Sequence, residues 1–153
     1  MNFSTLNLVA TPGTLGTKPD VSKPNPDFLT QLTEEGFREL ISEHYELLKD
    51  SDISQLFPTQ DPQEFADAKK HAADFMIQIC GGPKYFNESR GAPMMGKRHA
   101  PFRIDEYARQ RWLECYAMLL PSLSPKVSNE NIQSYWNYLN VFSQWMVNTP
   151  TQQ

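Results

Sequence analysis

The sequence predicts one all-α domain built on four long helices. Apolar residues recur at spacings of three and four along four separate segments, which is the pattern of helices with one buried face. Prolines and glycines separate these segments, and no segment has a convincing strand pattern. With 153 residues, 39% of them hydrophobic, the chain is long enough for a single packed core.

The first 27 residues differ from the rest of the chain. They contain four prolines, two glycines and several serines and threonines, and proline lacks the amide donor that a helix needs. We therefore expect an irregular N-terminal extension over residues 1–27 and a helical domain over residues 28–150. The sequence leaves open whether the extension is a disordered tail or docks on the domain, with the segment STLNLVA as a short helix.

The first predicted helix follows Thr33, a good N-cap residue, and ends at Asp50. Two glutamates come directly after Thr33 and suit the positive end of the helix dipole. The periodicity places His44 and Tyr45 on the buried face together with four apolar residues. That face consists of Phe37, Leu40, Ile41, His44, Tyr45 and Leu48.

The second predicted helix begins with Asp61 as N-cap and Pro62 in the first helical position. Two positions of its apolar face are alanines, Ala68 and Ala72, and so narrow a face leaves room for a flat group beside it. The run Gly81-Gly82-Pro83 ends the helix sharply. The face consists of Phe65, Ala68, Ala72, Phe75, Met76 and Ile79.

Residues 84–103 are predicted to be irregular, with at most a short helix around His99. A loop of this length in a compact domain usually has a functional reason. His99 lies between the basic pair Lys97-Arg98 and Pro101, with apolar residues close on both sides. A surface histidine needs no such setting, which makes His99 the leading candidate for a functional residue.

Two further helices complete the predicted domain. Asp105 is expected to cap the third long helix, whose apolar face includes Trp112, and Pro121 follows its end. Ser128 is expected to cap the last helix, which ends before Pro150.

Composition excludes several classes of protein. The net charge is −4 and no basic stripe is present, so nucleic acid is not an expected partner. Cys80 and Cys115 form no CxxC pair, and we expect them to be buried free thiols in a reducing compartment. We find no secretory signal and no apolar run near the roughly 20 residues of a membrane span, so we expect a cytoplasmic protein without one.

The three histidines make no metal-binding pair at helical spacing, and HExxH is absent, so a zinc site is disfavoured. Haem needs one axial nitrogen, a dry apolar slot, cations for two propionates and polar groups near the ligand. His99 could supply the nitrogen while its second ring nitrogen donates to a backbone carbonyl. The surrounding residues also have ordinary structural explanations: the aromatics as core packing, the lysines as solvated surface charges and the methionines as fillers of gaps in the core. Residue patterns alone therefore leave haem binding as one option among several.

The segment GGPKYFNESRGAPMMGKRHAPFRIDEYARQRWLECYAMLL, residues 81–120, resembles the truncated haemoglobins, and their group II in particular. It contains in order a Gly-Gly-Pro, a tyrosine-bearing turn, an Arg-Gly, a His-x-Pro-Phe after arginine and a Trp-Leu-x-Cys. Residues 37–58 look like the family's helix B and the turn after it. The resemblance covers roughly residues 31–148.

The resemblance implies a globin-like two-over-two helical sandwich with an irregular segment before the proximal histidine, and haem b as cofactor. His99 matches the proximal iron ligand, and Tyr45 and Trp112 match the residues that hydrogen-bond the ligand. We add His44 to these ligand-binding candidates because, with no other ligand present, Tyr45 or His44 could occupy the sixth site of ferric iron. The expected haem contacts are Phe57, Ala68, His71, Ala72, Phe75, Met95, Lys97, Arg98, Phe102, Ile104 and Trp112.

The expected function is the binding of O2, CO, NO or a similar small ligand by a bacterial haem protein, with an unidentified reductase. Because Ala68 and Ala72 stand where the family often has a polar residue, ligand stabilisation would depend on Tyr45 and Trp112. Two alternatives remain open. One is peroxidase or NO-detoxifying activity at the same iron, and the other is a haem-free helical interaction module.

Overall fold

The computed structural model describes residues 5–151 and is all-helical over that range, which confirms the predicted class. None of its helices is long and apolar enough to span a membrane. The four long helices are α1 (Pro26–Lys49), α2 (Pro62–Ile79), α5 (Glu106–Leu119) and α6 (Asn129–Phe142). The short elements are α3 (Tyr85–Arg90), α4 (Met95–His99) and the 3₁₀ helices η1 (Ser54–Leu56), η2 (Leu120–Leu123) and η3 (Ser143–Met146).

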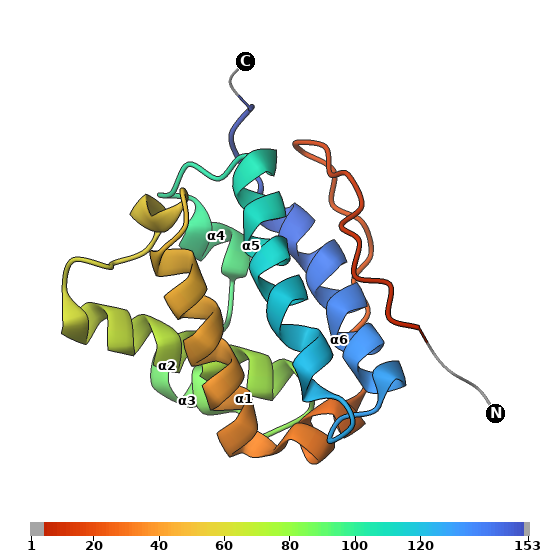
Figure 1. Cartoon of the computed structure of the whole chain (residues 1–153). Helices are drawn as coiled ribbons and strands as arrows, with labels where there is room; N and C mark the ends of the chain where they lie inside the picture. Colours follow the sequence, from red (N-terminus) through yellow and green to blue (C-terminus); the bar gives the residue numbers. More distant parts are fainter. Residues whose placement is uncertain (1–4, 152–153) are drawn as a thin grey trace.

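The long helices form two pairs (Figure 1). Helix α1 crosses α2, while α5 and α6 run next to each other on the other side of the molecule. Helix α1 also contacts α5 and α6, so it joins the two pairs. This is the two-over-two sandwich that we expected. The segment between α2 and α5 contains α4, the short helix allowed around His99, and is less irregular than predicted because it also forms α3.

Helix α1 begins earlier than predicted. Its axis is broken at Thr33, where φ is +72°, and the hydroxyl of Thr33 accepts a hydrogen bond from the amide of Gly36 at 3.2 Å. Thr33 therefore caps the longer second part of the helix, as its sequence position indicated. The short part before it was missed, and it buries Phe28 and Leu32 in the core.

The other three N-caps were predicted correctly. In each case a side-chain oxygen accepts a hydrogen bond from the amide three residues later, which satisfies one of the donors left free at a helix start. The pairs are Asp61 with Glu64 (3.2 Å), Asp105 with Ala108 (2.8 Å) and Ser128 with Asn131 (3.3 Å).

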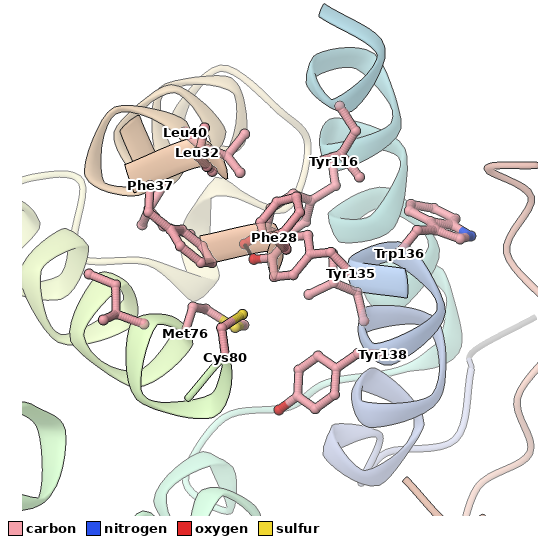
Figure 2. Packing of buried hydrophobic residues seen from close by; sticks show 14 of the residues in the cluster. Phe28, Leu32, Phe37, Leu40, Met76, Cys80, Tyr116, Tyr135, Trp136 and Tyr138 are labelled. Atoms are coloured by element: carbon pink, nitrogen blue, oxygen red, sulfur yellow. Dashed lines mark hydrogen bonds between the residues drawn. The ribbon is translucent and has the colours of Figure 1, made fainter. Parts of the chain in front are cut away.

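An aromatic cluster holds α1 against α5 and α6 (Figure 2). Tyr135 stacks on Phe28 with ring centroids 4.4 Å apart and meets Phe37 edge-on at 5.4 Å. Its hydroxyl donates to that of Tyr116 at 3.2 Å, so both buried phenols have a partner. The cluster therefore sets the position and orientation of α1 relative to α5 and α6.

Residues 5–25 lie along the outer side of α6 without forming a helix (Figure 1). The amide of Thr11 donates to Asn140 at 3.0 Å, and Trp145 donates to the carbonyl of Pro19 at 2.7 Å. Of the two alternatives left open by the sequence, the docked one holds for these residues. The expected short helix over STLNLVA is not formed by residues 5–10, and Ser4 lies outside the described residues.

Arg109 joins this extension to the α5–α6 pair. Its side chain is only 1% exposed, and the guanidinium donates to the carbonyls of Thr11 (2.9 Å) and Asn140 (2.6 Å). It also donates to the hydroxyl of Ser143 at 2.9 Å and pairs with Glu106 at 2.8 Å. A buried charge is tolerated only with such a set of partners, so the contact between the extension and the body is specific.

Both cysteines are buried and unpaired, as predicted. Burial raises the pKa of Cys80 to about 12 and also raises that of Cys115. Neither thiol is therefore a reactive thiolate at neutral pH.

Asp74 supplies a stability test on α2. Its side chain is 1% exposed and pairs with Arg38 and Lys70, each at 2.8 Å. Burial by itself raises the pKa of Asp74, but the hydrogen bonds from Lys70 and Arg38 outweigh it and hold that pKa below its ordinary value. A lowered pKa contributes stability above the unfolded pKa of about 3.9, and this is lost as the pH falls through the folded pKa.

We therefore expect Asp74→Asn to lower the free energy of unfolding by about 1–3 kcal/mol at pH 7. The difference from the parent protein should shrink near pH 3, because this is below the unfolded pKa of about 3.9 and the stabilisation decreases as the pH falls toward the lowered folded pKa. Urea unfolding at both pH values measures it. Asp67→Asn, on the exposed side of the same helix, is the control. An equal loss of stability at both pH values would contradict the ion-pair explanation.

Candidate functional site

A cavity of about 400 Å³ opens among α1, α2, α4, α5 and η3. Its size is that of a small-molecule site, and most of its lining is apolar. A second hollow, beside Arg103 and Thr149, is open to the surface and contains none of the predicted site residues. Twelve predicted residues line the cavity: Tyr45, Phe57, Ala68, His71, Ala72, Phe75, Met95, Arg98, His99, Phe102, Ile104 and Trp112.

His99 is the last residue of α4, and it brings an imidazole to the cavity. Its Nδ1 lies 2.7 Å from the carbonyl oxygen of Met95. A carbonyl only accepts, so the proton of the neutral ring belongs on Nδ1, and Nε2 keeps its lone pair. This is the tautomer of a metal-ligating histidine, and the carbonyl partner is the one that the sequence analysis required.

Asn148, which the sequence analysis missed, fixes the segment that follows His99. Its side-chain amide donates to the carbonyls of His99 (3.2 Å) and Phe102 (2.8 Å). Its side-chain oxygen accepts from the amide of Ile104 at 2.9 Å, and its own amide donates back to the carbonyl of Ile104 at 2.9 Å. The only sequence signal was an asparagine just before Thr149-Pro150, where the chain has left the last helix.

Tyr45 from α1 and Trp112 from α5 bring two hydrogen-bond donors to the same cavity. Both side chains are half-buried, and within residues 5–151 neither the Tyr45 hydroxyl nor the Trp112 Nε1 has a hydrogen-bond partner, so both donors are available to a ligand. The Tyr45 ring is held edge-on against Phe57, with centroids 5.5 Å apart. Burial raises the pKa of Tyr45 to about 12, so its hydroxyl remains a donor at neutral pH.

Arg98 lines the cavity but is largely committed to the loop before α4. Its Nε donates to the carbonyl of Pro93 at 2.7 Å, and its Nη2 donates to those of Arg90 (2.8 Å) and Ala92 (3.1 Å). Its guanidinium also lies over the ring of Phe86, 5.1 Å from the centroid. Arg98 therefore mainly stabilises this loop, and its Nη1 takes no part in these hydrogen bonds.

His71 and Arg90 are two further basic residues at the cavity, where Arg109 is already engaged by Glu106, Ser143 and two carbonyls. Nδ1 of His71 is buried without a hydrogen-bond partner in the described structure. Burial, followed by the charges of Arg90 and Lys70, lowers the pKa of His71. No other described residue forms a hydrogen bond or ion pair with the Arg90 side chain, so its charge is available to an anionic group at the edge of the cavity.

Two of the expected site residues, His44 and Lys97, are not among the residues that line the cavity. His44 is fully buried and stacks on Tyr116 with ring centroids 3.7 Å apart, on the α5 side of the cavity wall. Successive helical residues point about 100° apart, so the neighbour of Tyr45 faces a different direction. Lys97 is exposed, two residues before His99 on the short α4.

Several lining residues were not predicted as site residues. Phe86 is buried in the lining, whereas Tyr85 lies outside it with Arg38 5.7 Å from its ring centroid. The Tyr85-Phe86 pair signalled an aromatic here but did not say which ring enters the cavity. The remaining unpredicted residues are Ile53, Leu56, Pro58, Met76, Arg90, Ala108, Arg109, Phe142, Ser143 and Met146.

Several solved structures with a similar fold are globins. Hell's gate globin IV, crystallised with phosphate, is 35% identical, covers 88% of this chain and 82% of its own, and superposes with a TM-score of 0.81. The thermostable haemoglobin of Thermobifida fusca is 30% identical, with coverages of 81% and 98% and a TM-score of 0.71. The group II truncated haemoglobin of Bacillus anthracis is 25% identical, with coverages of 89% and 97% and a TM-score of 0.73.

Sequence relatives agree over shorter segments. A group 2 truncated haemoglobin of Bacillus subtilis is 33% identical over 54 residues, which are 35% of this chain and 41% of that protein. Two-on-two haemoglobin-3 of Arabidopsis thaliana is 38% identical over 48 residues, 31% of this chain and 27% of that protein. Each match thus spans less than half of the relative. The family model of the bacterial-like globins, however, matches residues 32–148. The chain therefore belongs to the bacterial-like globin family, whose general function is haem-based ligand binding, and its fold is that of the group II truncated haemoglobins.

Proposed function

We propose that this protein binds haem b through His99 and holds a diatomic ligand such as O2, CO or NO with Tyr45 and Trp112. One observation carries the proposal. The bond from His99 Nδ1 to the Met95 carbonyl, 2.7 Å long, leaves Nε2 as an acceptor in the cavity to which the two unpartnered donors also belong. A metal-binding nitrogen and two ligand-binding donors thus meet in one apolar space.

The remaining lining supports a flat apolar cofactor with an anionic edge. Ala68 and Ala72 present little side-chain volume on the α2 side, and the apolar residues around them exclude water. His71 and Arg90 offer basic groups to propionates. When bound, haem supplies an iron atom with a coordination position for the ligand. The chain supplies the axial nitrogen, the dry surroundings and the hydrogen bonds.

Binding is favoured over catalysis by the groups near the two ring nitrogens. The partner of His99 Nδ1 is a backbone carbonyl, which makes the imidazole a weaker electron donor than a carboxylate partner would. On the α2 side of the cavity, Ala68, Ala72 and Phe75 offer no acid or base, and we assign the remaining α2 base, His71, to the propionates. The buried free thiols fit a reducing compartment, and we propose the cytoplasm, with an unidentified reductase keeping the iron ferrous.

The test is an absorption spectrum of the purified, haem-supplied protein, first ferric and then reduced under CO. We expect a Soret band that shifts when CO binds to the reduced protein. No Soret band would remove the haem function and favour the haem-free helical module. Turnover of peroxide with a donor dye well above that of free haem would favour the enzymatic alternative.

A further inference from the structure

His44 occupies an unusual place for a polar residue. It is fully buried on α1, next in sequence to Tyr45, and its Nε2 lies 3.0 Å from the carbonyl oxygen of Trp112 on α5. Its ring stacks on Tyr116 at 3.7 Å between centroids and meets the Trp112 ring edge-on at 5.3 Å. One side chain on α1 thus connects the helix of one ligand donor to the backbone of the other.

The contact is a hydrogen bond from a neutral ring. A carbonyl only accepts, so Nε2 carries the proton. Burial lowers the pKa of His44 to about 3, with the bond to Trp112 a smaller opposing effect, so the ring remains neutral across the ordinary pH range. Nδ1 is buried and has no hydrogen-bond partner within residues 5–151.

Folding stability does not explain a histidine here. Trp112 lies inside α5, so its carbonyl also has the regular helical donor four residues later, Tyr116. The unpartnered Nδ1 loses its hydrogen bonds to water on burial, a cost that phenylalanine would not carry. Phenylalanine would also stack on Tyr116. The added feature of the imidazole is the Nε2 hydrogen bond across the two helices.

We propose that His44 is a positioning residue for the ligand-binding indole: its bond to the Trp112 carbonyl fixes Trp112 relative to Tyr45. This inference rests on the proposed function of Trp112. The bond joins the residue beside Tyr45 directly to the backbone of Trp112, so it sets the spacing of the two donors with few intervening rotations. Hydrogen-bond strength falls steeply with angle, and a displaced indole would therefore donate poorly to a ligand.

The test compares His44→Phe, which keeps the stacking, with His44→Gln, whose amide can still donate to the carbonyl. In the CO complex, we expect His44→Phe to move the C–O stretch to higher wavenumber, toward the value of Trp112→Phe, because less positive charge faces the ligand. O2 should dissociate about 2–10-fold faster, the range of one ordinary hydrogen bond. His44→Gln should shift both values back toward those of the parent protein.

A stability measurement separates this role from a structural one. We expect the urea midpoint of His44→Phe to be equal to or higher than that of the parent. A lower midpoint with unchanged C–O stretch and unchanged O2 dissociation would overturn the inference. If His44→Phe gives no folded protein, His44→Leu, which also lacks a donor, takes its place.

The double variant His44→Phe/Trp112→Phe tests whether His44 acts through Trp112. We expect its C–O stretch and O2 dissociation rate to equal those of Trp112→Phe alone. A further change of either value in the double variant would show independent action and overturn the inference. If Trp112→Phe has the C–O stretch and O2 dissociation rate of the parent protein, the proposed function of Trp112 is wrong. This single variant therefore separates a failure of the proposed function from a failure of the inference about His44.

Discussion

His99→Ala is expected to release haem from the protein about 10–100-fold faster, or more, than the parent chain does. Loss of a residue that only hydrogen-bonds a metal ligand typically lowers metal affinity by about 10–100-fold. This variant removes the ligand itself. His99 is the cavity histidine whose Nδ1 is engaged by a carbonyl, which leaves Nε2 for the iron. Haem transfer to an excess of an acceptor apoprotein measures the rate, and the absorption bands report the change of ligand.

His71→Ala is the matched control, because His71 also lines the cavity but its ring makes no bond that directs Nε2 toward a metal. We expect this control to keep the absorption bands of the parent. His99→Gly with added imidazole should recover those bands, since the free base can occupy the space of the lost side chain. Haem held as firmly in His99→Ala, with unchanged bands, would contradict ligation by His99.

The helices were predictable because their signals are local. Asp61, Asp105 and Ser128 each bond an amide three residues away, so the sequence near each cap contained the whole interaction. The first part of α1 was not predictable in this way. It follows a proline-rich stretch, and its helical turns are stabilised by burial of Phe28 and Leu32 against distant helices. The short helix α3 is likewise too brief to show a periodic pattern, whereas α4 is the short helix that the sequence allowed around His99.

Within the candidate site, the residues that sequence analysis identified are those with a recognisable spacing or motif. Asn148 was missed because it binds His99 and Phe102 across 49 and 46 residues of sequence, a relation that only the folded chain reveals. His44 was correctly assigned to the buried face of its helix, but its ring packs on Tyr116 of α5 and is not part of the cavity lining. The sequence contains no information on which neighbouring helix a buried residue faces, and that direction separates His44 from Tyr45.

Tyr45→Phe is expected to speed O2 dissociation by up to about 10–100-fold. The phenol donates to a strongly polarised ligand, and such a bond contributes about 1.5–3 kcal/mol. The ring itself is retained, so its packing on Phe57 should persist. Because burial raises the pKa of Tyr45 to about 12, the effect should be the same from pH 6 to pH 9. Stopped-flow displacement of O2 by CO measures the rate.

The second donor sets the size of this effect. Trp112 lines the same cavity and can re-aim toward the ligand once the Tyr45 hydroxyl is gone, so the single variant should lose less than the double variant Tyr45→Phe/Trp112→Phe. Tyr85→Phe is the control, because Tyr85 lies outside the cavity beside Arg38 and its loss should leave the rate unchanged. An unaltered O2 dissociation rate in Tyr45→Phe, with the double variant equal to Trp112→Phe, would remove Tyr45 from ligand binding and leave the indole as the sole donor of the pair.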